Sequence, residues 1–333
     1  MLALEYTRLG RGGPRVSVVG LGFWQAGGRA WRLNGHGWVE SVVGEALDRG
    51  INLFDTAEIY GWGRSERLLG EALRRLGAGD DVVVASKVGG FRVNTASIIR
   101  GVKGINRRLG RTVDLVQHHW PPPVYVPLCA TIRGLERAVL EGHAHYYGLS
   151  NYPASLMEKA YSCAKRIEPV SDQVQYSLAY RSAENRLLPH SRQRGYTIIA
   201  WSPLAKGALA GKSRPSDPAQ KADPVFRAAA GDTRLQNALD TVAGRHRATR
   251  AQVALAWLIA KGAIPIPGTR KPERVAEIAG SATLRLGEDD IRLLDEAGRE
   301  YLYRWGRTYR ALWYMRLIPC LLQVASIRLM GGV

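Results

Sequence analysis

The chain has 333 residues, of which 46% are hydrophobic and 23% charged, a composition typical of a globular protein with a sizeable core and not of a disordered one. Its 47 Lys and Arg against 29 Asp and Glu give a formal net charge of +18, which favours anionic partners such as nucleic acid, acidic lipid or a phosphorylated cofactor. Because the basic residues are spread along the chain and no uncharged run reaches the ~18 residues of a membrane span, we expect no specific nucleic-acid partner and no membrane span.

Short apolar or β-branched runs alternate along the chain with stretches of helical periodicity, which is the pattern of βα units in a parallel sheet. The eight predicted strands cover residues 16–22, 51–55, 82–86, 113–118, 145–150, 170–175, 196–201 and 263–267. Between them, helices are predicted over residues 39–49, 65–76, 96–109, 128–141, 155–166 and 251–261. Eight parallel strands with helical crossovers close into a barrel. The predicted fold class is therefore α/β, a (β/α)8 TIM barrel over residues 1–300 with a C-terminal extension over 301–333 that packs on the barrel or on a partner.

Two segments depart from this alternation. Residues 204–231 are rich in Gly and Pro and show no clear periodicity, which predicts a long irregular loop that covers the functional site. Residues 301–333 contain six aromatic residues and five Arg, and no acid follows Glu300. Pro319 interrupts any helix there. We expect part of this segment to pack beside the barrel mouth, and attachment to an anionic membrane surface is the alternative.

Four residues with acid–base chemistry lie near the ends of predicted strands. Asp55, Lys87 and His119 each fall at the carboxyl end of a strand, and Tyr60 lies five residues beyond Asp55. Barrel enzymes place their active sites at this end. An ammonium lowers the pKa of a neighbouring tyrosine, and a carboxylate keeps that ammonium charged. The four residues therefore form a candidate proton-donor system, in which the histidine orients a substrate oxygen.

The same regions carry motifs that resemble those of the aldo-keto reductase family. The match includes FDTAEIYG (54–61), ASKVGG (85–90), DLVQHHWP (114–121) and YGLSNY (147–152), and it continues in QVQYSL (173–178), IIAWSPLAKGALAGK (198–212) and IPIPGTRKPERVAEI (264–278). The GTR sequence is familiar in the branch of bacterial reductases and potassium-channel beta subunits. The resemblance implies an NADPH-dependent oxidoreductase that reduces aldehydes or ketones, as small-molecule carbonyl substrates, to alcohols by hydride transfer with a Tyr proton donor.

By this resemblance the catalytic residues are Asp55, Tyr60, Lys87 and His119. His119 is chosen over His118 because the family's histidine immediately precedes Trp-Pro, and because neighbouring strand residues point to opposite faces. The walls of the substrate pocket are expected to be Trp24 and Trp120, whose motifs border the same strands.

The resemblance also implies a set of NADPH contacts, namely Ser150, Asn151, Gln173, Trp201, Ser202, Leu204, Gly207, Gly268, Arg270 and Arg274. The first three would face the nicotinamide carboxamide, with Trp201 stacked on the ring. The next three would lie along the pyrophosphate. The last three would lie near the adenosine 2′-phosphate, and because guanidinium pairs bidentately with phosphate, NADPH is expected to be preferred over NADH.

Some positions depart from the family pattern. Phe23 stands where many members carry a small hydroxyl residue, Val116 where an aromatic is common, and Ile278 where an asparagine often meets the adenine. None of these belongs to the catalytic set. That set also occurs in the channel beta subunits, so the alternative function is a cofactor-binding regulatory or redox-sensing subunit with slow turnover. An oligomer is possible.

Neither a metal site nor a disulfide framework is expected. His143 and His145 lie two residues apart, but no third ligand accompanies them. Cys129, Cys163 and Cys320 are too few and too scattered for a framework or a CxxC site. Because the amino-terminal residues also lack a signal-peptide core, the sequence predicts a cytoplasmic protein of a reducing compartment.

Overall fold

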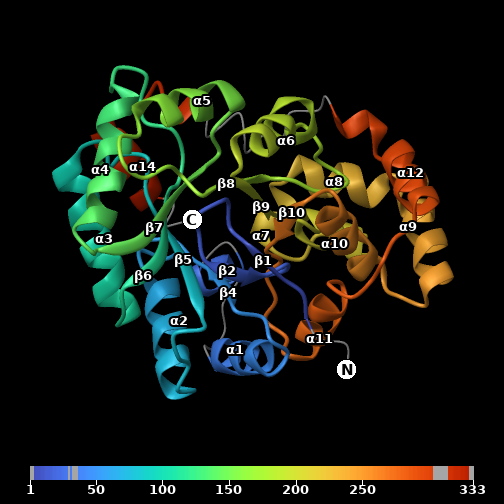
Figure 1. Ribbon diagram of the computed structural model, residues 1–333. Coiled ribbons are helices and arrows are strands. Elements are labelled where there is room, and N and C mark those ends of the chain that lie inside the picture. Colours follow the sequence, from blue (N-terminus) through green and yellow to red (C-terminus); the bar gives the residue numbers. More distant parts are fainter. Residues whose placement is uncertain (1–3, 29–30, 32–36, 303–313, 330–333) are drawn as a thin grey trace.

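A computed structural model describes residues 4–28, 31, 37–302 and 314–329. Within these ranges the main sheet has eight strands in the order β10-β9-β8-β7-β6-β5-β4-β3, and neighbouring strands are parallel. They are β3 (Leu21–Gly22), β4 (Leu53–Asp55), β5 (Val83–Val88), β6 (Val113–His118), β7 (Ala144–Ser150), β8 (Ser171–Gln175), β9 (Thr197–Trp201) and β10 (Ala263–Pro265). The Gly20 and Gly22 amides donate to the carbonyls of Pro265 and Pro267, both at 3.0 Å, and join the two ends of the sheet. The predicted (β/α)8 barrel is confirmed (Figure 1).

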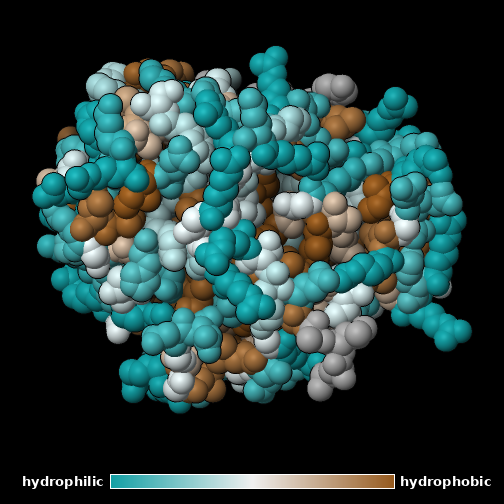
Figure 2. Space-filling model, viewed as in Figure 1, coloured by the Kyte–Doolittle hydropathy of each residue, from teal (hydrophilic) through white to brown (hydrophobic). Residues whose placement is uncertain are grey.

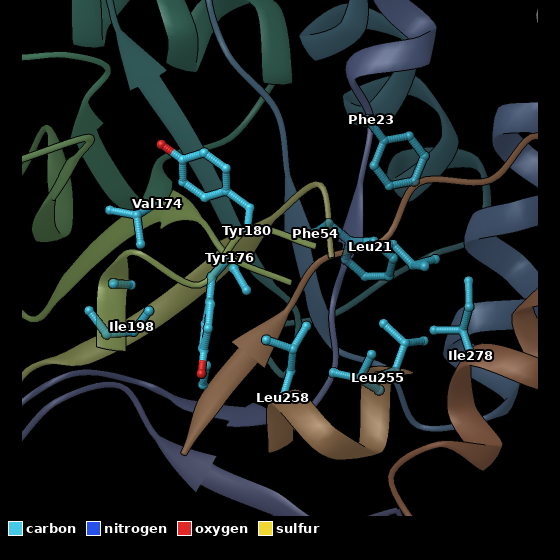
Figure 3. Packing of buried hydrophobic residues seen from close by; sticks show 14 of the residues in the cluster. Leu21, Phe23, Phe54, Val174, Tyr176, Tyr180, Ile198, Leu255, Leu258 and Ile278 are labelled. Carbon is cyan, nitrogen blue, oxygen red and sulfur yellow. The ribbon is translucent and has the colours of Figure 1, made fainter. Parts of the chain in front are cut away.

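The strands are buried on both faces, because the barrel interior lies on one side and the helices on the other. Along β4, Leu53 belongs to the apolar cluster inside the barrel, and the next residue, Phe54, belongs to the larger cluster between strands and helices. Figure 3 shows part of this larger cluster, with Leu255 and Leu258 of α10 (Arg250–Ala260) in the same layer as Phe54. The alternation along each strand therefore decides which side chains can reach the barrel mouth.

The predicted strand over residues 16–22 is divided in the structure. Its first part belongs to β2 (Arg15–Ser17), which pairs antiparallel with β1 (Tyr6–Arg8) in a separate sheet, and its last part is β3. The chain leaves β2 where the Ser17 hydroxyl donates to the Val19 carbonyl at 2.7 Å, a local bond that competes with strand pairing. The single predicted strand is therefore wrong.

The β1–β2 hairpin covers the amino-terminal end of the barrel (Figure 1). Leu9 and Val16 complete the interior apolar cluster. The Gly10 amide donates to the Thr197 hydroxyl at the start of β9, at 2.8 Å. Figure 2, in the same view, shows mainly hydrophilic side chains across this face. The opposite end of the barrel, where the strands end, is left for the functional site.

Helices connect the strands and surround the barrel. They include α1 (Trp38–Asp48), α2 (Arg64–Arg75), α3 (Thr95–Leu109), α4 (Leu128–Leu140), α5 (Ala154–Cys163), α6 (Ala183–Arg194), α9 (Thr233–His246), α10, α11 (Glu273–Gly280) and α12 (Glu288–Ala297). The six predicted helices are confirmed, with their ends within three residues of the predicted positions. Asn94 and Thr249 start α3 and α10 with capping boxes, which satisfy amides that the first turn leaves unpaired.

The predicted irregular loop over residues 204–231 contains ordered elements. They are η3 (Ala205–Ala210), α7 (Pro218–Lys221) and α8 (Pro224–Gly231). Asp217 and Asp223 precede these two helices, each followed by Pro, and Asp223 accepts a backbone hydrogen bond from Val225. An acidic cap before a proline is a helix-start signal. The prediction of a segment without secondary structure is therefore wrong.

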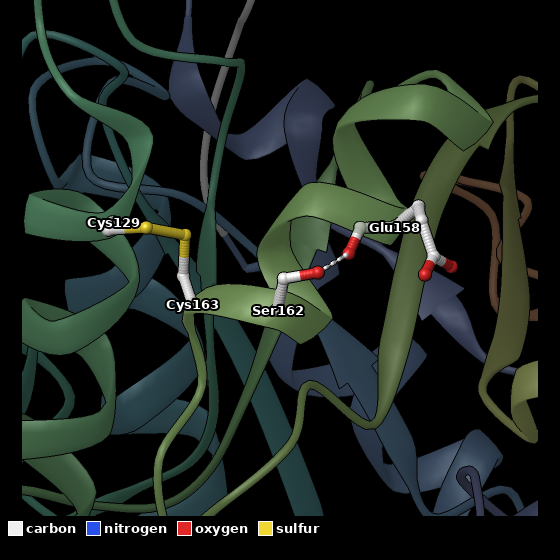
Figure 4. Close-up of a disulfide and its surroundings, with 4 residues drawn as sticks. All are labelled: Cys129, Glu158, Ser162 and Cys163. Atoms are coloured by element: carbon white, nitrogen blue, oxygen red, sulfur yellow. Dashed lines mark hydrogen bonds between the residues drawn. A yellow bond between two sulfur atoms is a disulfide. The ribbon is translucent and has the colours of Figure 1, made fainter.

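Cys129 of α4 and Cys163 of α5 form a disulfide, with their Cα atoms 4.9 Å apart (Figure 4). No disulfide framework was expected, and this single bridge is a departure from that expectation. The pairing depends on how α4 packs against α5, which the spacing of the cysteines does not reveal. Cys320 is a free, half-buried thiol.

The C-terminal extension begins with η4 (Arg299–Leu302) and, after the residues that the structure does not describe, ends in α14 (Cys320–Leu329). Tyr301 is buried, and its hydroxyl donates to Asp232 at 2.8 Å. Four of the aromatic residues of this segment lie outside the described residues, namely Tyr303, Trp305, Tyr309 and Trp313. α14, in dark red in Figure 1, contacts the loop between β6 and α4, where the Cys320 amide donates to the Tyr125 hydroxyl at 3.2 Å.

None of the helices in the described ranges has the length and apolar character that crossing a bilayer requires. The cytoplasmic location stays a prediction, as does the possibility of an oligomer.

Candidate active site

Four polar side chains come together at the carboxyl end of the barrel. Asp55 is the last residue of β4, Lys87 lies in β5, and His119 directly follows β6. Tyr60 lies in the turn between β4 and α2 and is half-buried, whereas the other three are buried. The structure thus brings all four predicted catalytic residues to one end of the barrel.

Lys87 is the centre of this group. Its ammonium donates to the Asp55 carboxylate at 2.6 Å, to the Thr56 carbonyl at 2.8 Å and to the Tyr60 hydroxyl at 3.4 Å. These three acceptors compensate the desolvation of a buried cation. Burial lowers the pKa of Lys87, but Asp55 and Tyr60 raise it by more, so the pKa lies above its ordinary value. The lysine is therefore an ammonium at neutral pH.

Tyr60 stays protonated in this environment. Burial raises the pKa of its hydroxyl, Lys87 lowers it, and Asp55 raises it again; the net pKa lies above the ordinary value of 10.0. The sequence led us to expect that Lys87 would lower this pKa. Lys87 does so, but burial has the larger effect. The phenol is consequently a proton donor at neutral pH and not a tyrosinate.

His119 faces Tyr60, with ring centroids 5.7 Å apart and ring planes at 80°. Burial, Lys87 and His118 all lower its pKa, well below 6.5, so the imidazole is neutral. Its Nδ1 has no hydrogen-bond partner within the described ranges. His118 points away, with Nδ1 2.8 Å from the Tyr152 hydroxyl. Alternation along β6 thus sends one histidine to the site and the other to the layer outside the barrel.

Two glutamines surround the Asp55 carboxylate. The Gln173 amide donates to Asp55 Oδ2 at 2.7 Å, and the Gln117 amide donates to the same oxygen at 3.4 Å. Gln173 was expected at the nicotinamide, which stays a prediction, and its amide nitrogen contacts the Asp55 carboxylate. Gln117 was missed by the sequence analysis, although its position two residues before His119 places it on the same face of β6, where it pairs with Lys87. Together they hold the carboxylate that faces the lysine.

Ser150, Asn151 and Trp201 form a connected set next to His119. The Asn151 amide donates to the His119 carbonyl at 2.9 Å, and the Trp201 indole donates to Asn151 Oδ1 at 3.1 Å. The Ser150 hydroxyl donates to the Gln173 carbonyl at 2.8 Å. Asn151 has a φ of +63°, a left-handed conformation that asparagine tolerates better than most residues. The bonds fix these side chains before any ligand binds.

The segment after β9 has an unusual backbone. Ser202, Ala205, Lys206 and Gly207 have φ values of +53°, +46°, +55° and +104°. Left-handed residues among right-handed ones turn successive amides to one side and create a cavity for an anion. The Ser202 hydroxyl is buried without a partner in the described part of the chain. Leu204, which directly precedes η3, is half-buried.

Lys206 was not singled out from the sequence. Its ammonium pairs with Asp223 at 2.9 Å and lies 5.2 Å from the centre of the Trp24 ring. It therefore connects η3 and α8 to the aromatic side of the site. Its position in the LAKG sequence before Gly207 was the available signal.

The residues expected near the 2′-phosphate follow β10. Gly268, Arg270 and Arg274 are all exposed. Arg270 donates to the Trp31 carbonyl at 2.9 Å. Arg274 donates to Glu277 at 2.7 Å, and 57% of its side chain is exposed. An anion at this point would meet two guanidinium groups, one of which already has a carboxylate partner.

The two expected pocket walls differ in their surroundings. Trp24 is half-buried, and its ring lies 6.5 Å from Tyr60 and 5.3 Å from Trp31. Trp120 is only 2% exposed and lies 5.2 Å from the His119 ring. Its indole donates to Gln323 of α14 at 3.2 Å. The C-terminal helix therefore covers Trp120.

The departures from the family pattern are core positions. Phe23, Val116 and Ile278 are buried in the cluster between strands and helices. The two neighbouring histidines each contact a different acid, His145 with Asp114 at 3.1 Å and His143 with Glu141 at 3.3 Å. Across the described ranges, no group of three side chains could hold a metal ion.

Comparison with known proteins places this geometry in context. A family model described as "Aldo/keto reductase family" matches residues 18–299. An uncharacterized oxidoreductase of Mycobacterium tuberculosis is 37% identical over 305 residues, which cover 86% of this chain and 91% of the relative. A putative voltage-gated potassium channel subunit beta of Schizosaccharomyces pombe is 34% identical, and the match covers 81% of this chain and 85% of that protein. An aldo-keto reductase from Klebsiella pneumoniae, crystallised with NADPH, is 28% identical with a TM-score of 0.72 over 90% of this chain and 96% of its own.

Proposed function

Because this chain belongs to the aldo/keto reductase family, we propose that it is an NADPH-dependent oxidoreductase that reduces the carbonyl group of an aldehyde or ketone to an alcohol. The observation that carries the proposal is the Lys87 ammonium, placed between the Asp55 carboxylate and the Tyr60 hydroxyl beside a neutral His119. Carbonyl reduction needs a positioned acid at the oxygen, and this group supplies one.

The residues after β7, β9 and β10 fit a phosphorylated dinucleotide. Trp201 offers a half-buried aromatic face, and the partnerless Ser202 hydroxyl lies in the left-handed segment whose amides favour an anion. Arg270 and Arg274 suit a phosphate at the other end. NADPH bound there would supply the hydride, which is chemistry that no side chain can provide.

The protein's own residues would manage the oxygen of the substrate. Tyr60, kept protonated by burial, donates its proton to that oxygen as negative charge develops on it. The neighbouring Lys87 stabilises the tyrosinate that is left. Neutral His119, which carries one N–H, orients the same oxygen by a hydrogen bond. Gln117 and Gln173 keep Asp55 in place against the lysine.

Tyr60→Phe tests the donor. We expect kcat for carbonyl reduction to fall by about 100-fold or more, while the Kd for NADPH changes little, because the hydroxyl acts on the substrate. Steady-state oxidation of NADPH with a panel of aldehydes and ketones, combined with fluorescence titration of the cofactor, measures both. Tyr6→Phe, which removes the hydroxyl of an exposed tyrosine in β1 at the opposite end of the barrel, is the matched control. Near-normal turnover of the Tyr60 variant would mean that another group donates the proton.

A second function follows from the relative that is named as a potassium channel subunit beta. In that case the protein binds NADPH tightly and senses its redox state, with slow turnover. Multiple-turnover assays separate the two functions: one turnover followed by a stall, with retained oxidised cofactor, favours the sensor, and sustained turnover favours the reductase.

A further inference from the structure

Exposed apolar side chains are concentrated at one place on the described surface. Nine large hydrophobic side chains are exposed in the described ranges. Six of them belong to the C-terminal extension (301–333), called the tail from here on, or to the loop between β6 and α4 that the tail contacts. We call these six the tail patch: Val124, Tyr125, Tyr314, Leu317, Leu321 and Leu322. Leu321 is 84% exposed and Leu317 is 63% exposed. Contiguous exposed apolar surface of this kind marks an interaction site.

Hydrogen bonds hold the two parts of the tail patch together. The Val124 amide donates to the Arg316 carbonyl at 2.9 Å. The Cys320 amide donates to the Tyr125 hydroxyl at 3.2 Å. The patch is thus one surface built from two distant segments of the chain.

The exposed side of α14 carries Leu321 and Leu322 beside Ala325 and Arg328. Its inner face carries Gln323, which is fully buried and bonded to Trp120, and Ile327, which is 2% exposed. Gln323 also donates to the carbonyls of Met315 and Ile318, at 2.7 and 2.9 Å. A polar residue is therefore fixed inside and leucines are held outside, whereas a solvated helix normally presents polar residues to water.

The charge of the tail indicates what covers this surface. Residues 301–333 contain five Arg and no Lys, Asp or Glu, in a chain with net charge +18. Arg328 is exposed on α14, with its guanidinium 5.8 Å from the centre of the Trp62 ring. A second copy of the chain would bring two such cationic tails together. Two cationic tails repel each other, whereas an anionic surface attracts a cationic tail.

We propose that the tail patch docks on the surface of an anionic lipid bilayer. The leucines enter the boundary between headgroups and acyl chains, and the exposed Arg328 lies among the lipid phosphates. Because no described helix can span a bilayer, the attachment is peripheral and reversible. Ile327 lies in one apolar cluster with Ala57, Ile59 and Trp120, against which Tyr60 packs, so docking places the barrel mouth close to the lipid.

The test is co-sedimentation of the full chain with vesicles. We expect binding to vesicles of phosphatidylcholine mixed with phosphatidylglycerol, weaker binding as salt is raised from about 0.1 to about 0.5 M, and little binding to pure phosphatidylcholine. The double variant Leu317→Asp/Leu321→Asp should bind at least about tenfold more weakly, because it removes two inserting side chains and adds repelling charge. Leu140→Asp is the matched control. Leu140 is 46% exposed at the carboxyl end of α4, on the opposite end of the barrel, and its substitution should leave vesicle binding unchanged.

Circular dichroism and thermal unfolding check that both variants fold, which we expect because the substituted positions are exposed. The proposal is overturned if the unmutated chain does not bind anionic vesicles, or if the double variant binds as well as the control. A third outcome would also overturn the proposal. If analytical ultracentrifugation shows a dimer that the double variant abolishes, and the unmutated chain does not bind vesicles, the tail patch is an interface between two copies of the chain. None of these readouts depends on carbonyl reduction, so they are independent of the proposed function.

Discussion

At the scale of single residues, the site is defined by which groups carry charge at neutral pH. Burial and the neighbouring charges act in opposite directions on the pKa of Lys87, whereas on Tyr60 only Lys87 opposes burial; both pKa values end above their ordinary values. On His119 they act in the same direction, and its pKa falls. The site therefore combines an ammonium, a phenol and a neutral imidazole, which is the set of protonation states that carbonyl reduction needs.

These shifts predict the pH profile. Tyr60 donates only while protonated, and its pKa lies above 10.0; His119 charges only below its own pKa, well under 6.5. We therefore expect kcat/KM for reduction to be flat between those two ordinary values. It should fall above 10.0 as the phenol loses its proton, and fall on the acid side only well below 6.5, where the imidazole is protonated. Steady-state rates across this range measure it. An inflection near 6.5 that disappears in His119→Gln would show that the imidazole titrates and that it is not held neutral.

Cofactor choice is also decided by single residues. Arg274→Ala removes the guanidinium that we propose contacts the 2′-phosphate, and it leaves Glu277 without that partner. We expect the Kd for NADPH to rise roughly tenfold, equivalent to about 1.5 kcal/mol, with little change for NADH. Arg292→Ala is the matched control, because Arg292 is similarly exposed and paired with an acid three residues away on α12. If the unmutated protein binds both cofactors equally, the assignment of Arg274 is wrong.

At the scale of elements, the sequence predicts the helices and strands that apolar periodicity specifies. It does not predict features that depend on a local hydrogen bond or on tertiary contacts. Helices and barrel strands follow from their apolar patterns. The hairpin of β1 and β2 does not, because the run over 16–22 is mostly apolar and the break after Ser17 is made by a local hydrogen bond. Within the site, predicted strand ends locate Asp55, Lys87 and His119. The contact of Gln173 with Asp55 depends on the direction of the side chain, which no spacing reveals.

The α4–α5 bridge is the element-scale feature with the largest expected effect on stability. It links residues separated by 34 positions, and a cross-link over a loop of that length stabilises by about 3–4 kcal/mol in the chain-entropy model. We expect Cys129→Ala/Cys163→Ala to lower the urea midpoint accordingly and to make unfolding insensitive to reductant. Cys320→Ala should keep the reductant sensitivity of the unmutated chain. A midpoint that reductant does not move in the unmutated protein would contradict the bridge.

At the scale of the whole molecule, the C-terminal helix lies against the site from outside. Deletion of residues 320–333 removes Gln323 and Ile327 and uncovers Trp120, while Tyr301 and its bond to Asp232 are kept. We expect KM for carbonyl substrates to change several-fold and the Kd for NADPH to change little, because the residues proposed to bind the cofactor lie at or after the ends of β7, β9 and β10. Steady-state kinetics with short and long aldehydes provide the measurement. If the Kd for NADPH rose and the KM for carbonyl substrates stayed the same, α14 would not border the substrate pocket.

The disulfide between α4 and α5 also affects how the chain responds to a pulling force. Joined at Cys129 and Cys163, the chain contains a covalent ring that includes all of β7, the strand that ends at Ser150. A pulling force applied at the two ends of the protein is transmitted through the two sulfur atoms, so the residues between the cysteines bear no tension. The 34 peptide units between the cysteines, which would span roughly 110 Å when extended, are thus withheld from the stretched length of the oxidised chain and released only by reduction.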